Sequence, residues 1–163
     1  MNPSKAVFSL FLLFLSSSIA FADSGEHESE NNSDAHHEFH PNMLAVFVGV
    51  TDEDRNVDAA TLGVEYARRF SESFSIVGVV ERTFGDLDVW VYAIPFAYHT
   101  GPWKIYAGPG IEDADGHDTE FLVRLGVEYG FEVGSWEIAP QLNVDLVDGD
   151  QLLVLGVTFG KGF

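Results

Sequence analysis

Imidazole and carboxylate side chains gather near the start of the chain, over residues 23–42, which read DSGEHESENNSDAHHEFHPN. His36, His37 and His40 lie close enough in sequence to bind zinc, copper or nickel together. The stretch has no Lys or Arg and only one large apolar side chain, Phe39, so it cannot bury enough surface to fold. We expect a disordered, acidic, His-rich arm. Two interpretations of its histidines stay open: a weak divalent-cation site, and a solvated tail that binds no metal.

Histidines beyond residue 42 occur at two positions, His99 and His117. Nucleophilic catalysis needs a hydroxyl within reach of a base that a third group holds in place. His117 has Asp118 and Thr119 beside it, but it has no serine nearby, and the chain contains no cysteine. We therefore expect no enzymatic activity, and no cofactor other than a weakly bound divalent cation.

Further polar side chains occur at every second position of otherwise apolar segments. In residues 120–133, EFLVRLGVEYGFEV, one row is wholly apolar, whereas the other contains glycines, Arg124 and Glu128. Gln141, Asn143 and Asp145 follow the same period in residues 135–146. Successive side chains of a strand point to opposite faces, so a period of two predicts strands with one apolar and one polar face.

Segments of this kind fill the chain from residue 43 onwards and predict an all-β fold of eight strands. They lie at about 43–51, 59–70, 73–83, 88–99, 102–112, 118–133, 135–146 and 151–163. The connections at 71–73, 100–102 and 134–135 are tight, and the connections between them are longer or strongly acidic. In an antiparallel up-and-down arrangement, alternate connections meet at the same end. One end should therefore carry short turns and the other end acidic loops.

The composition of the two rows indicates which face meets which solvent. The polar rows are rich in glycine, which weakens a solvent-exposed strand but leaves room inside a narrow barrel. Lysine follows residue 22 only at positions 104 and 161, although soluble surfaces usually carry many. Aromatic side chains cluster near the strand ends, as in the girdles of membrane barrels. They are Phe70, Phe74, Trp90, Tyr98, Trp103, Phe131, Trp136 and Phe163. The prediction is an eight-stranded antiparallel up-and-down transmembrane β-barrel over residues 43–163, with its apolar rows toward lipid.

The polar rows then point into the lumen, where buried charges must be paired or hydrogen-bonded. We expect an ion network with Arg124 at its centre, and with Glu65, Glu128 or Asp145 as its partner. The predicted members of this network are Glu65, Glu81, Arg124, Glu128, Gln141, Asn143 and Asp145. The facing of the first, third and fourth strands stays unassigned. Pro95, Pro109 and Pro140 fall inside predicted strands, so they indicate either bulges or misplaced strand ends.

The start of the chain has the pattern of an export signal. Lys5 precedes an apolar run over residues 6–15, and Ala20 and Ala22 form a small-x-small cleavage pattern, which predicts a signal peptide over residues 1–22.

The formal net charge of −18 argues against nucleic acid as a partner, because binding phosphates needs a basic surface.

These features resemble the small outer-membrane barrels of Gram-negative bacteria, of the OmpA transmembrane-domain and OmpX type. The resemblance covers residues 43–163 and includes a final strand that ends in Phe163, with Phe159 and Val157 at alternate positions before it. Lys161 departs from the pattern, which usually has an apolar residue there. The resemblance implies an outer-membrane location, a periplasmic N-terminal arm, and lipid and lipopolysaccharide as surroundings. It also implies that Phe163 is part of the signal that the barrel assembly machinery recognises.

Three functions are consistent with such a barrel. The first is a structural or envelope role with a side-chain-filled lumen, or with very limited passage of solutes or ions. The second is a divalent-metal-binding envelope protein that uses the His-rich arm and the acidic loops. The third is a lipid A-modifying enzyme, which the scarcity of serine and histidine disfavours.

Overall fold

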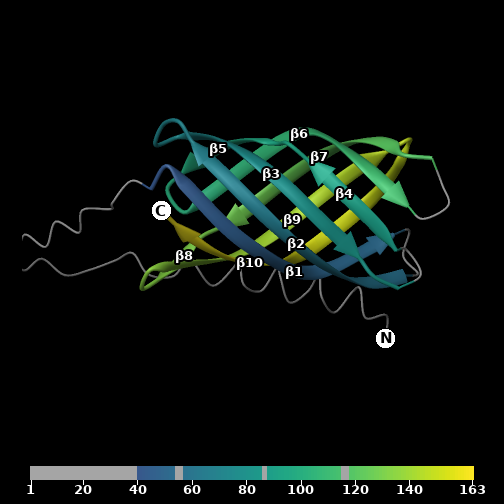
Figure 1. Cartoon of the computed structure of the whole chain (residues 1–163), viewed down its shortest axis with the longest axis horizontal. Coiled ribbons are helices and arrows are strands. Elements are labelled where there is room, and N and C mark those ends of the chain that lie inside the picture. The colour runs from purple at the N-terminus through teal and green to yellow at the C-terminus, as the bar shows by residue number, and fades with distance from the viewer. Residues whose placement is uncertain (1–39, 54–56, 86–87, 115–117) are drawn as a thin grey trace, which may run out of the picture. The chain divides into compact units, whose positions relative to one another are not determined.

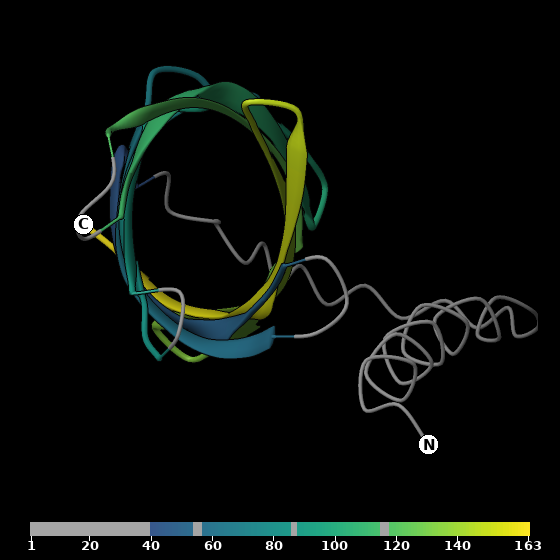
Figure 2. The same cartoon turned by 90° about the vertical axis from the view of Figure 1, so that its right-hand side faces the viewer.

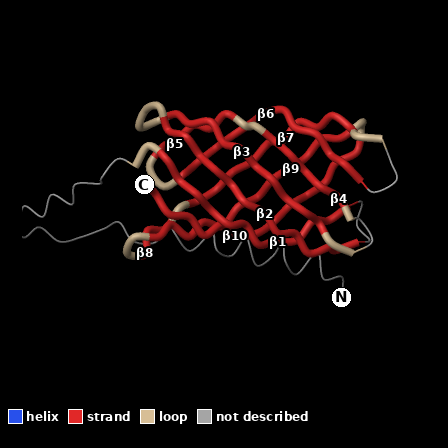
Figure 3. The backbone as a smooth tube through the Cα atoms, viewed as in Figure 1, coloured by secondary structure: helices blue, strands red, loops and turns tan. Residues whose placement is uncertain are grey.

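The computed structural model describes residues 40–53, 57–85, 88–114 and 118–163, and these form a closed antiparallel β-barrel (Figure 1). Viewed along its axis, the barrel is a ring of strands (Figure 2). Strand makes up most of the described chain, and loops occur mainly at the two ends (Figure 3). No helix of the described residues is both long and apolar enough to cross a membrane.

Ten strand segments make up eight crossings of the barrel. They are β1 (Asn42–Glu53), β2 (Val57–Arg69), β3 (Phe74–Thr83), β4 (Val89–Ala93), β5 (Phe96–Thr100), β6 (Trp103–Ala114), β7 (Glu120–Tyr129), β8 (Phe131–Val133), β9 (Trp136–Val147) and β10 (Asp150–Gly162). β4 and β5 together form the fourth crossing, and β7 and β8 form the sixth. β10 pairs with both β9 and β1, which closes the sheet. The prediction of an eight-stranded antiparallel up-and-down barrel is confirmed.

The fourth crossing is divided at Ile94 and Pro95 because proline has no N–H to donate to the ladder. The register is the same on both sides of this break. The Pro95 carbonyl accepts a hydrogen bond from the Val77 N–H (2.9 Å), and Ile94 donates to the Pro109 carbonyl (2.9 Å). Pro109 and Pro140 also lie in strands of unshifted register. None of the three prolines marks a bulge, because the register is unshifted at each of them. Pro95 does mark a strand end inside the predicted strand 88–99, whereas Pro109 and Pro140 lie inside β6 and β9.

The register fixes the tilt of the strands. A path from partner to partner leaves β1 at Asn42 and returns to it at Asp52, ten residues further along, after one circuit. The intermediate partners are Arg68, Ile76, Phe96, Ala107, Leu125, Val144 and Leu153. With a rise of about 3.3 Å per residue and a strand spacing of about 4.7 Å, this stagger tilts the strands by about 40°. Eight strands at this tilt enclose a lumen that side chains can fill.

Side chains alternate between lumen and exterior along every crossing. In residues 120–133, Phe121 is 65% exposed and Arg124 is 0% exposed, so the apolar row faces outward as predicted. The first, third and fourth crossings direct mainly small or apolar side chains inward. These are Ala45, Phe47, Val77, Val79, Val89, Val91, Ala93 and Ala97.

The outer surface is almost wholly apolar across the middle of the barrel and aromatic near its ends. Its exposed side chains include Val46, Val48, Leu62, Val64, Ile76, Val80, Ile105, Ile111 and Leu125. At the short-turn end, the Phe74 and Phe96 ring centroids lie 5.6 Å apart, and the Trp103 and Tyr129 centroids lie 4.8 Å apart. An apolar belt between aromatic girdles is the outer surface that a bilayer requires.

Candidate functional site

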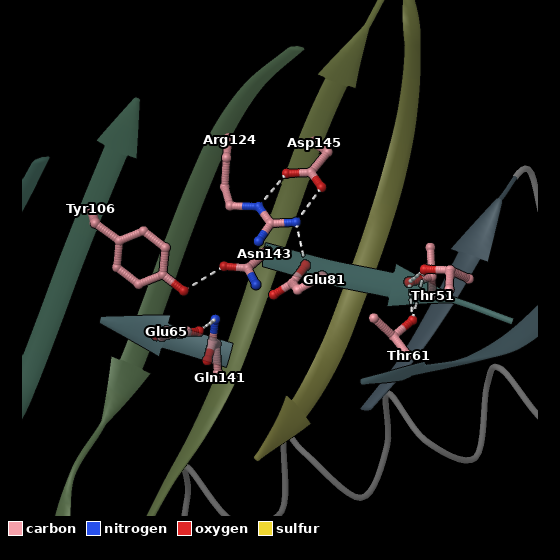
Figure 4. Close-up of polar contacts among 10 residues, drawn as sticks. Thr51, Thr61, Glu65, Glu81, Tyr106, Arg124, Gln141, Asn143 and Asp145 are labelled. Atoms are coloured by element: carbon pink, nitrogen blue, oxygen red, sulfur yellow. Dashed lines mark hydrogen bonds and ion pairs between the residues drawn. The ribbon is translucent and has the colours of Figure 1, made fainter. Parts of the chain in front are cut away.

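Arg124 occupies the centre of the lumen and contacts carboxylates from two other strands (Figure 4). It lies directly opposite Asp145 in the ladder between β7 and β9, so the two side chains enter the lumen side by side. Its Nε and one terminal nitrogen donate to the two Asp145 oxygens, both at 2.7 Å. The same terminal nitrogen donates to Glu81 Oε2 of β3 at 2.7 Å. Arg124 therefore ties β7 and β9 to β3 on another part of the wall.

Lys104 forms a second charged centre nearer the short-turn end. It pairs with Glu128 in the ladder between β6 and β7, and its Nζ lies 2.6 Å from Glu128 Oε2. Glu65 of β2 lies 3.8 Å from the same ammonium group and accepts a 3.0 Å hydrogen bond from Gln141 Nε2. Because Gln141 is opposite Glu128 in the β7–β9 ladder, this centre joins four strands.

Tyr106 and Asn143 occupy the lumen between the two charged centres. The Tyr106 hydroxyl donates to Asn143 Oδ1 at 2.5 Å. Gly126 lies between them in the sheet, paired with Tyr106 on one side and with Asn143 on the other. A Cβ at this position would overlap the Tyr106 ring and the Asn143 oxygen. Glycine is needed here because the tyrosine ring lies across the backbone of β7.

All seven side chains predicted for the lumen network are buried, each with at most 3% of its surface exposed. Their pairing differs in part from the expectation. Arg124 contacts the expected Asp145 together with Glu81, whereas Glu65 and Glu128 gather around Lys104. Lys104 is the member that the predicted set omits. The period of two predicts its inward position, because Trp103 and Ile105 on either side of it belong to the outward row of the same strand.

Carboxylates outnumber cations in this network. Among the described residues, the ion-pair partners of Glu65, Glu81, Glu128 and Asp145 are Lys104 and Arg124, and all six side chains are almost fully buried. A buried charge is costly unless it is paired, so the two cations hold together a set of groups that would otherwise destabilise the barrel. The contacts cross the lumen from several strands, which makes the network a brace between opposite walls.

Apolar and hydroxyl side chains fill the lumen on the loop side of Arg124. Val89, Val91, Leu122, Val147 and Leu152 form one buried apolar cluster. Three threonines of β1, β2 and β3 bond to one another, with Thr61 at 2.7 Å from Thr51 and 2.9 Å from Thr83 (Figure 4). Apolar and hydroxyl side chains thus predominate between the charged layers and the loop end, with Glu112 of β6 as an inward carboxylate among them.

His99 lies near the short-turn end and contacts both Arg69 and Ser75. Arg69 donates to His99 Nδ1 at 2.9 Å, because a guanidinium can only donate. The proton of the neutral ring must then lie on Nε2, which is 2.8 Å from the Ser75 hydroxyl. A ring nitrogen that carries a proton cannot accept one from serine, so this contact has the wrong polarity for a Ser–His nucleophile pair.

The other predicted site residues lie at or beyond the edge of the described chain. His36, His37 and His117 are outside the described residues, and His40 is exposed just before β1. Within the described ranges, no three His, Cys, Asp or Glu side chains are grouped to hold a metal ion. Phe163 is exposed, and its backbone pairs with Asn42 through hydrogen bonds of 2.9 and 3.2 Å.

The chain is similar to known proteins in its three-dimensional structure. No family model and no curated protein matches the chain. The Yersinia pestis outer membrane protein Ail in a phospholipid nanodisc superposes with a TM-score of 0.50, at 10% identity over 74% of this chain and 99% of that chain. The N-terminal β-barrel domain of Pseudomonas aeruginosa OprF gives a TM-score of 0.51, at 14% identity over 74% and 98%. The de novo designed TMB2.3 gives 0.52, at 17% identity over 75% and 96%.

At these identities the likeness establishes the fold alone. The chain has the fold of the small eight-stranded outer-membrane β-barrels, as the resemblance of its sequence implied. The structures that it matches differ widely in origin and include a designed protein. The fold is therefore no guide to one activity, and function must be argued from the lumen and the outer surface of this chain.

Proposed function

We propose that this chain is an integral protein of the outer membrane with a closed lumen and a structural role in the envelope. The apolar outer belt and its aromatic girdles support insertion into a bilayer, because a soluble barrel would expose this surface to water. The short turns then face the periplasm and the acidic loops face outward, as in other outer-membrane barrels.

The brace around Arg124 is the single observation that carries the closed lumen. The proposal is supported by a guanidinium with 0% exposure that is bonded to carboxylates of two other strands, because such a group occupies the lumen at that height and is shielded from water. The apolar cluster around Leu122 covers the brace on the loop side. An ion crossing the barrel would have to displace both layers, and breaking a buried ion pair costs about 3–5 kcal/mol.

Conductance across a planar bilayer tests the proposal. The refolded mature barrel is reconstituted at a potential of about 100 mV, with a large trimeric porin as the positive control in the same bilayer. We expect no discrete current steps from this chain. Stable steps that scale with the amount of inserted barrel would refute the closed lumen. Heat-modifiable migration on a gel confirms folding in each preparation. An absence of current that is caused by misfolded protein can therefore be distinguished from a closed lumen.

We also propose that the outer-membrane assembly machinery recognises β10 together with Phe163, which directly follows it. The exposed Phe163 ring and the outward Phe159 of β10 support this role, since both side chains are accessible from outside the barrel. Phe163→Ala should lower the amount of folded barrel in cell membranes and leave spontaneous refolding into detergent unchanged. Equal losses in both assays would indicate a purely structural role.

The metal-binding role of His36, His37 and His40 stays a prediction. Calorimetric titration of the mature chain with zinc, and of a variant with all three histidines replaced by glutamine, tests it directly. Heat of binding that the variant loses would support a metal-binding arm. Identical traces would leave the histidines as part of a solvated tail.

A further inference from the structure

Positive side chains are scarce in the described chain, and most of them have partners within the barrel. Lys104 and Arg124 belong to the lumen network, and Arg69 contacts His99. Arg82 faces outward at the loop end but pairs with Asp88 at 2.9 Å. The cations that remain are Arg68 and Lys161, which are both exposed on the outer face near the short-turn end. No carboxylate of the described residues lies within ion-pair distance of either one.

These two cations lie on either side of β1. Leu44 of β1 pairs with Lys161 of β10 on one side and with Tyr66 of β2 on the other. Arg68 follows Tyr66 by two residues and therefore points the same way. The Cα atoms of Lys161 and Arg68 are thus separated by two strand spacings across the sheet and by two residues along it, roughly 12 Å in all. We call the outward surface of Asn42, Leu44, Tyr66, Arg68 and Lys161 the β1 seam.

Polar contacts hold the arginine end of the β1 seam in place. Arg68 and Tyr66 both donate to Asn42 Oδ1, at 2.7 and 2.8 Å. Asn42 is itself fixed by backbone bonds to Phe163. One terminal nitrogen of Arg68 is used in this way, and the other guanidinium N–H groups have no acceptor among the described residues. Lys161 Nζ lies over the Trp136 ring of β9, 5.8 Å from its centroid, on the side of β10 away from β1. A phosphate that bridges the two cations must therefore draw the flexible lysine side chain back toward β1.

We infer that the β1 seam binds the phosphodiester headgroup of an anionic phospholipid in the periplasmic leaflet. The inference rests on the proposed insertion into the outer membrane. Both cations lie at the height of the aromatic girdle, which is also the height of the lipid phosphates in a bilayer. The guanidinium offers a planar pair of donors that suits a phosphate. Leu44 and Tyr66 provide an apolar surface between the cations for the upper part of the acyl chains.

Lipid retention measured by native mass spectrometry tests this site. The mature chain is refolded in detergent and mixed with phosphatidylglycerol or with phosphatidylcholine at equal concentration. We expect wild type to retain phosphatidylglycerol in preference. Arg68→Gln and Lys161→Gln should each lower that retention about fivefold, and the double variant about 25-fold. Arg68→Lys should recover part of the loss of Arg68→Gln, because it restores the charge without the planar donors.

Arg82→Gln is the matched control, since it removes an outward cation at the other end of the barrel. Its retention of phosphatidylglycerol should equal that of wild type. Equal retention by wild type and the double variant, or an equal loss in Arg82→Gln, would overturn the inference. Gel migration of unheated samples reports insertion separately, so a chain that fails to fold as a membrane barrel contradicts the proposed function instead of the lipid site.

Discussion

Replacing Arg124 tests whether the lumen network braces the barrel. Arg124→Met keeps a long side chain in the lumen but removes three hydrogen bonds, each of 2.7 Å, to Asp145 and Glu81. Hydrogen bonds to charged groups contribute about 1.5–3 kcal/mol each, and they are not additive within one network. Removal of one partner from a buried ion pair costs about 3–5 kcal/mol, because it leaves uncompensated charge behind. We expect the variant to lose about 3–5 kcal/mol of unfolding free energy.

Urea unfolding in phospholipid vesicles measures this loss, with fluorescence of the three tryptophans as the signal. The cost should come from the stranded carboxylates and not from the smaller side chain. Arg124→Met combined with Glu81→Gln and Asp145→Asn should therefore recover most of the stability, since neutral groups of similar volume can replace a buried ion network.

Arg82→Met provides the control on the outer surface. Its ion pair with Asp88 is 39% and 46% exposed, and such pairs contribute at most about 1 kcal/mol. The reasoning fails if Arg124→Met lies within about 1 kcal/mol of wild type. It also fails if the triple variant is as unstable as the single one, because the stranded charges would then not be the cause.

Three further changes test other layers of the structure by the same unfolding assay. Lys104→Met should destabilise by about 3–5 kcal/mol, and added Glu128→Gln should recover part of this; no recovery would mean that Glu128 is not the stranded partner. Gly126→Ala should cost about 1–3 kcal/mol because its Cβ overlaps Tyr106, whereas outward Gly78→Ala has room and should cost nothing; equal effects would contradict the packing argument. Leu125→Arg on the mid-barrel lipid face should cost about 2–4 kcal/mol in vesicles, and Val133→Arg near the short-turn end at most about 1; similar costs would argue against a bilayer around the belt.

The period of two determined most of the fold before any tertiary contact was known. Which row faces outward follows from local composition, because glycine, charge and amide side chains share one row and branched apolar side chains share the other. The inward positions of Arg124, Glu128 and Asp145 could be predicted in this way. The facing of the fourth crossing could not be predicted, since nearly every residue from Val89 to Tyr98 is apolar and the two rows have the same character.

Only the closed barrel decided which charges meet. Alternation says that Glu65, Glu81 and Glu128 all point inward, but it says nothing about their heights along the axis. Those heights depend on the accumulated stagger of eight paired strands, which brings Glu81 of β3 to Arg124 of β7 and leaves Glu65 beside Lys104. Whether a side chain faces the lumen depends on its position within one strand, so the sequence alone determined it. Which side chains meet across the lumen depends on the register of all eight crossings, so only the tertiary structure decided it.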